Sequence, residues 1–216
     1  MLDLFHGTAL SRLPQIAREG IRPGFAAPNQ WNEGWKSPAG LVYLTNRWAA
    51  YYAGNPRAGL EGAPDGAVII RVRIDPAGVQ LFPDEDYLRY LLEHPESDAV
   101  QEVAKSIGDV RHASIDPTES LWQELGFTWE RSFTEYGSVA TPHVDVGWLV
   151  GFHQILSWEE FGIFAEEDYL KRPFPIKICY HAEAFKDELE RRSYNAISDA
   201  ASRAYNRCRP ATGGFR

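Results

Sequence analysis

The sequence has too few cysteines for a disulfide framework or a zinc site. Its 216 residues include two, Cys179 and Cys208. The histidines outside the first strand are scattered without metal-ligand spacing, so no metal is expected: His94, His112, His143, His153 and His181. This cysteine usage makes the cytoplasm, where thiols stay reduced, the default compartment. An effector exported without a classical signal would have the same composition.

Long apolar runs and several common catalytic motifs are also absent. No stretch approaches the roughly 18 to 20 apolar residues that span a bilayer, so no membrane partner is expected. The N-terminus lacks the charged and apolar regions of a secretory signal. Without GxGxxG, a P-loop or HExxH, the sequence does not support a Rossmann dehydrogenase, a nucleotide kinase or a zincin.

Negative charge dominates overall but is unevenly spread. The formal net charge is −8, yet residues 177–216 hold eight basic against five acidic side chains, which leaves −11 on residues 1–176. A basic tail on an acidic body favours contact with nucleic acid or an acidic partner. Late arginines more often only complement a helix C-terminus. The acidic run Asp84-Glu85-Asp86 is likewise interpreted as the favoured opening of a helix rather than a cation site.

Strands and helices follow one another irregularly, which predicts an α+β fold in one domain. With 44% hydrophobic residues the chain has enough apolar side chains for an ordinary globular core. Hydrophobic periodicity and the positions of glycine and proline predict strands at 2–6, 40–45, 67–75, in GSVAT and in VDVGWLVGF. They predict helices at 11–19, 47–54, 85–107 in two pieces broken at His94-Pro95, 116–126, and over about 25 residues at the end of the chain.

Aromatic residues are abundant, with seven Trp, ten Tyr and eleven Phe, which favours stacking surfaces as well as a core. His6-Gly7 is expected to end the first strand, Tyr43 lies in the second, and Tyr51-Tyr52 follow on a short helix. If the two strands are neighbours, these residues line a cleft suited to a flat, amide-bearing ring. Gly7 has no Cβ, so a ligand can approach its N–H and C=O closely, while an aromatic ring stacks on the ligand.

The order HGT, IAREGIRPG, VYLT and AAYYAG resembles the diphtheria-toxin and poly(ADP-ribose) polymerase branch of the ADP-ribosyltransferases, which has a His-Tyr-Glu signature. The likeness covers roughly residues 3–75. It implies an α+β ADP-ribosyltransferase-like fold: a split β-sheet core with flanking helices. Residues 1–176 would form the catalytic domain with a helical insertion at 83–130, and 177–216 a C-terminal helical extension.

The resemblance also implies roles for single residues. His6 would hydrogen-bond a hydroxyl of the nicotinamide ribose, and the Gly7 backbone would hold the carboxamide. Tyr43 would pack against the nicotinamide ring, with Tyr52, or else Tyr51, closing the other side. The expected residues of the NAD site are thus His6, Gly7, Thr8, Tyr43, Tyr51 and Tyr52.

A glutamate at the start of a late strand would complete the signature. Glu135, followed by Tyr136 and a β-prone run, is the first choice; Glu130 is the runner-up, and Thr134 is the other residue that could hold the motif's place. A carboxylate near the ribose stabilises the oxocarbenium-like sugar formed when the glycosidic bond breaks, and it helps to activate the acceptor. The expected catalytic residues are therefore His6, Tyr43 and Glu135.

The expected function is mono-ADP-ribosyl transfer from NAD, as co-substrate and without a metal, to a macromolecular acceptor. Protein and nucleic acid both remain open as acceptor, with a slight preference for protein. An NAD glycohydrolase and a non-catalytic module that binds NAD or ADP-ribose are the alternatives. RNA 2′-phosphotransfer is disfavoured by the tyrosine in VYLT. A toxin-like or phage-related role leaves room for an inhibitory partner protein.

Overall fold

The computed structural model describes residues 1–9, 12–23, 37–38, 40–47, 49 and 67–155. Most of the predicted helix at 47–54, including Tyr51 and Tyr52, and the whole predicted extension at 177–216 lie outside the described residues. No helix within the described residues is long and apolar enough to cross a membrane.

The described chain is α+β, as predicted, and contains a six-stranded antiparallel sheet in the order β4-β5-β2-β1-β3-β6. The strands are β1 (Leu2–Ala9), β2 (Val42–Thr45), β3 (Ala67–Ile74), β4 (Phe82–Pro83), β5 (Ser138–Thr141) and β6 (Leu149–Ile155). The helices are α1 (Leu13–Glu19), α3 (Glu85–Glu93), α4 (Asp98–Ile107), α5 (Ser120–Glu124) and α6 (Trp129–Arg131). Shorter turns are the 3-10 segments η3 (Pro76–Gly78) and η5 (Val146–Trp148) and the π-helical η4 (Ser132–Tyr136).

The sheet is divided between β1 and β2. β1 pairs with β3 along its whole length, from Leu2 opposite Ile74 to Ala9 opposite Ala67. β2 pairs with β5 through all four of its residues, but with β1 through a single pair, Phe5 and Thr45. The sheet therefore consists of two halves, β4-β5-β2 and β1-β3-β6, that are joined at one point.

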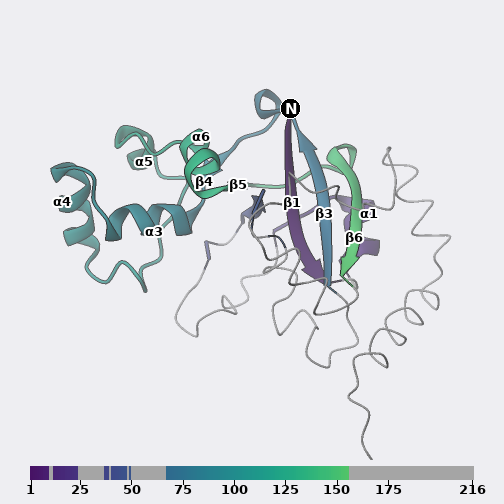
Figure 1. Ribbon diagram of the computed structural model, residues 1–216, viewed down its shortest axis with the longest axis horizontal. Coiled ribbons are helices and arrows are strands. Elements are labelled where there is room, and N and C mark those ends of the chain that lie inside the picture. Colours follow the sequence, from purple (N-terminus) through teal and green to yellow (C-terminus); the bar gives the residue numbers. More distant parts are fainter. Residues whose placement is uncertain (10–11, 24–36, 39, 48, 50–66, 156–216) are drawn as a thin grey trace, which may run out of the picture.

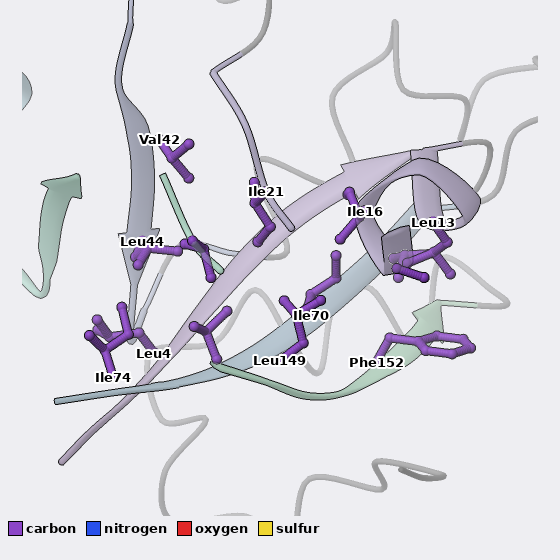
Figure 2. Close-up of a cluster of buried hydrophobic side chains, with 14 of the residues drawn as sticks. Leu4, Leu13, Ile16, Ile21, Val42, Leu44, Ile70, Ile74, Leu149 and Phe152 are labelled. Carbon is purple, nitrogen blue, oxygen red and sulfur yellow. The ribbon is translucent and has the colours of Figure 1, made fainter. Parts of the chain in front are cut away.

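One face of the sheet packs against α1 (Figure 2). Leu4, Leu44 and Ile70 alternate with residues that point the other way, as the two-residue period of a strand requires, and they belong to one buried cluster with Leu13 and Ile16 of α1. Gly20 ends α1 with a positive φ of 76°, and a Cβ there would lie 2.0 Å from the Val144 carbonyl oxygen. Glycine thus allows the chain to turn and form the Ile21–Val144 bridge.

Helices α3 to α6 lie together on one side, next to β4 and β5 (Figure 1). They enclose a second cluster of buried side chains, which includes Tyr87, Leu88, Trp122 and Phe127. Ser97 begins α4 by accepting a hydrogen bond from the Val100 N–H, after the break at His94-Pro95. The two predicted helical pieces are therefore confirmed as α3 and α4.

The first strand is longer than predicted. His6 and Gly7 do not end the first strand but lie in the middle of β1, which continues through Thr8 to Ala9. The sequence pattern suggested a turn at Gly7, but an eight-residue partner, β3, keeps these residues extended. The π-helical η4 also differs from the prediction, because Glu135 lies in it and not at the start of β5, which begins at Ser138.

Candidate functional site

His6 lies where the two halves of the sheet separate. It stands opposite Ile70 of β3, one residue beyond the Phe5–Thr45 pair. Its Nδ1 is 3.1 Å from the Tyr43 carbonyl oxygen of β2. The imidazole thus links β1 to β2 next to the position where the backbone pairing of the two strands ends.

This contact places a proton on Nδ1 of His6, and burial determines the charge of the ring. A carbonyl oxygen can only accept, so the proton of the ring is on Nδ1, and Nε2 carries the lone pair. Burial lowers the pKa of His6, and the contact with the Tyr43 carbonyl offsets part of that effect. The ring is therefore neutral at pH 7, with Nε2 as a hydrogen-bond acceptor.

Tyr43 lies on β2 opposite Ala140 of β5, and its phenol is buried. Its hydroxyl makes no full hydrogen bond within the described residues. Burial is the largest cause that raises the pKa of Tyr43, and the negative charges of Glu85, Asp84 and Asp86 raise it further. The phenol thus faces the acidic start of α3.

Asp84 connects the start of α3 to β5. Its Oδ1 caps the helix by accepting the Asp86 N–H at 2.8 Å, and its Oδ2 accepts the hydroxyl of Ser138. Ser132 completes the connection, because its Oγ accepts the Asp84 N–H at 2.9 Å and donates to the Ser138 carbonyl at 2.7 Å. Burial, then the charge of Asp86, raises the pKa of Asp84 to about 7. Both carboxylate oxygens of Asp84 have protein partners, which indicates a structural role.

Glu85 follows directly and is 2% exposed. Burial raises its pKa to about 7, against the opposing effects of the Ser37 hydroxyl and the Arg89 guanidinium. Arg89 Nη1 is 3.7 Å from Glu85 Oε1 but only 2.7 Å from Asp86 Oδ1. Glu85 Oε2 is buried without a hydrogen-bond partner within the described residues. A carboxylate oxygen in this state is costly unless a ligand or water contacts it.

Glu135, the predicted third member of the site, has its partners in the helical part of the chain. Tyr87 Oη donates to Glu135 Oε2 at 2.5 Å, and Arg131 Nε donates to Oε1 at 2.9 Å. Arg131 and Tyr87 lower the pKa of Glu135, so it is ionised and paired at neutral pH. Glu130 and Thr134, the other predicted choices, are exposed.

Gly137 follows η4 and connects it to the end of β2. Its φ is +88°, and a Cβ would lie 2.4 Å from Asn46 Oδ1 and 2.8 Å from Arg47 Cδ. Its carbonyl accepts the Thr45 hydroxyl at 2.9 Å and the Asn46 N–H at 2.8 Å. Glycine suits this position because its φ is positive and because a side chain would meet those of Asn46 and Arg47, which follow β2.

The structure brings His6 and Tyr43 together, as predicted. Gly7 and Thr8 follow His6 on β1, opposite Ile69 and Val68 of β3. No family model, curated protein or solved structure matches the chain. Function must therefore be inferred from the site residues and their surroundings.

Glu85 is the site residue that the sequence pattern did not single out. The run Asp84-Glu85-Asp86 does open a helix, as predicted, with Asp84 as N-cap. The same run also faces Tyr43, more than forty residues earlier in the chain. The available signal was the presence of three acids where one capping residue is enough. Within the described residues no group of three or more His, Cys, Asp or Glu side chains is arranged to hold a metal ion.

The stability of the protein is expected to rise relative to an Asp84→Asn variant as the pH falls from 7.5 to 5. The pKa of Asp84 is about 7 in the folded chain, compared with its ordinary value of 3.8. Between these values the folded state binds more protons than the unfolded state, so lower pH favours folding. One pKa unit corresponds to about 1.36 kcal/mol, so the relative gain is a few kcal/mol at most. Urea unfolding at pH 5, 6 and 7.5 measures it, and identical pH slopes for the two proteins would contradict it.

Proposed function

We propose that the protein is an NAD-dependent mono-ADP-ribosyltransferase, which cleaves NAD at the bond between nicotinamide and ribose and transfers ADP-ribose to a macromolecular acceptor. The observation that carries this proposal is the position of His6. Its neutral imidazole spans the division of the sheet and contacts the backbone of Tyr43 through Nδ1 at 3.1 Å. Two residues that the family resemblance assigns to one ligand thus lie side by side.

The chemistry of His6 fits a ribose hydroxyl. Because Nδ1 carries the proton, Nε2 can accept a hydrogen bond from such a hydroxyl, and the lowered pKa keeps it an acceptor at neutral pH. The Tyr43 carbonyl fixes the orientation of the ring. A ligand hydroxyl therefore meets an acceptor that is already oriented.

The division of the sheet supports the same proposal. The resemblance implies a split sheet, and β1 and β2 pair only through Phe5 and Thr45. Gly7 comes immediately after His6, where β1 and β2 are no longer paired residue by residue. Its backbone is the proposed partner of the nicotinamide carboxamide, because a glycine allows close approach.

The non-catalytic module is the second candidate, and the pairing of Glu135 favours it. Arg131 and Tyr87 engage both oxygens of that carboxylate. If Glu135 were the carboxylate of the site, its charge would be largely compensated before any substrate arrived. Such a protein would bind NAD or ADP-ribose and leave the glycosidic bond intact.

Incubation with doubly labelled NAD separates the candidates. NAD carrying one label in nicotinamide and another in the adenylate is mixed with the full chain and a cell lysate, and the products are digested with nuclease or protease. The transferase releases nicotinamide and leaves the adenylate label on material sensitive to one of the two digestions. Release without macromolecular label would indicate a glycohydrolase. Binding without release would indicate the module, and neither binding nor release would refute an NAD site.

A further inference from the structure

A carboxylate that acts on the sugar has to keep its charge available. Electrostatic stabilisation of a developing cation is strongest from a preorganised group that is shielded from water. Glu135 does not meet this condition, because its side chain is 43% exposed and Arg131 lies 2.9 Å from Oε1. Its contacts with Arg131 and Tyr87 instead join η4 to α6 and α3.

Glu85 meets the condition. Its side chain is 3% exposed, and the Arg89 Nη1 beside it is 3.7 Å away and closer to Asp86. Oε2 is buried and lacks a hydrogen-bond partner within the described residues. The neighbouring Asp84 shows the contrast, since both of its oxygens accept hydrogen bonds from Asp86 and Ser138.

The position of Glu85 relative to Tyr43 connects it to the proposed NAD site. Tyr43 of β2 and Phe82 of β4 both lie opposite Ala140 of β5, and Glu85 follows Phe82 by three residues, so its charge acts on the Tyr43 phenol. The Tyr43 hydroxyl and Glu85 Oε2 are both buried without a hydrogen-bond partner within the described residues. Buried polar atoms without partners mark a place for a ligand that offers a donor and an acceptor.

We infer that Glu85, at the start of α3, supplies the carboxylate of the site, with Oε2 accepting a hydrogen bond from the ribose of NAD beside the bond that breaks. This inference rests on the proposed function. The bond from ribose C1′ to the nicotinamide nitrogen breaks, and its electron pair leaves with nicotinamide, which becomes neutral. The acceptor atom forms a new bond to C1′, and its proton passes to Glu85 and then to solvent. The pKa of about 7 suits Glu85 to take up and return that proton.

Three glutamine variants of the full chain test the assignment: Glu85→Gln, Glu135→Gln and, as a matched control, Glu93→Gln. Glu93 lies at the other end of α3 and pairs with Arg111. Glu85→Gln is expected to release nicotinamide from NAD about 10²–10³-fold more slowly, by analogy with the loss of other preorganised electrostatic groups. Its affinity for NAD, measured by calorimetry, should change only a few fold. Glu93→Gln should match the wild type, and Glu135→Gln should keep at least about a tenth of the rate.

A Glu85→Asp variant covers the case in which Glu85→Gln does not fold, as judged by circular dichroism. Aspartate keeps the negative charge but withdraws the oxygens by one methylene, so a folded variant should be at least about tenfold slower. Wild-type rates in a folded Glu85 variant would overturn the assignment. A loss confined to Glu135→Gln would overturn it in favour of Glu135. A wild-type protein that neither binds nor cleaves NAD would instead refute the proposed function itself.

Discussion

Replacing His6 with asparagine is expected to slow nicotinamide release from NAD by about tenfold to a hundredfold while the protein stays folded. The asparagine amide can place an N–H near the position of Nδ1 and keep the hydrogen bond to the Tyr43 carbonyl, which is 3.1 Å long for His6. It offers nothing at the position of Nε2. The proposed ribose hydroxyl then loses its acceptor, and a buried group left unsatisfied costs about 1–3 kcal/mol.

Glutamine at the same position is the matched control. Its longer side chain can place a carbonyl oxygen near the position of Nε2, but the Tyr43 contact is lost. His6→Gln should therefore be more active than His6→Asn and less stable toward urea. Equal activity of both variants and the wild type would show that His6 does not contact the reacting end of NAD.

Truncation of Trp122 to alanine is expected to have the largest effect on stability, about 3–5 kcal/mol. Trp122 is 2% exposed in the cluster of helical residues, and its Nε1 donates to the Asp116 carbonyl at 2.7 Å. The variant loses this hydrogen bond and leaves a cavity beside Leu88 and Phe127. Since domains are typically stable by only about 5–15 kcal/mol, much of the total is lost.

Urea unfolding measures this effect, and Trp122→Phe is its control. Phenylalanine keeps most of the apolar volume but not the N–H, so its loss should be clearly smaller than that of alanine. If both variants unfold at the wild-type urea concentration, the helical cluster does not contribute to the cooperative unfolding of the chain. Because α3 belongs to this cluster and carries Glu85, Trp122→Ala should also lower nicotinamide release.

Local patterns in the sequence were sufficient to predict several of the helices and strands. The apolar run at 67–75 predicted β3, and the break at His94-Pro95 separated α3 from α4. These features depend on side-chain periodicity and on residues that stop helices, both of which act over a few positions. The sequence also grouped His6 with Tyr43 on the condition that their strands are neighbours, and β1 and β2 are neighbours in the sheet.

The remaining features depend on contacts between distant segments. The sequence predicted that the first strand ends at His6 and Gly7. Its pairing with β3, however, determines how far β1 extends. β4 contains only Phe82 and Pro83 and becomes a strand through its pairing with β5. Glu85 reaches Tyr43 because α3 follows β4 and Asp84 is held by Ser138. No pattern within the acidic run itself reveals that neighbour.

The two buried clusters differ in how far apart their contacts lie along the chain, and this has a consequence for the order of folding. The cluster around Tyr87, Trp122 and Phe127 joins segments that follow one another, whereas the pairing of Leu2 with Ile74 closes a loop of about seventy residues. Short-range contacts form faster than long-range ones, because closing a long loop costs more entropy. Helices α3 to α6 should therefore assemble before the sheet, so that Glu85 is already part of a helix when the strands pair. The proposed site is completed only when β5 docks on β2, so we expect a chain stalled before that step to be inert toward NAD.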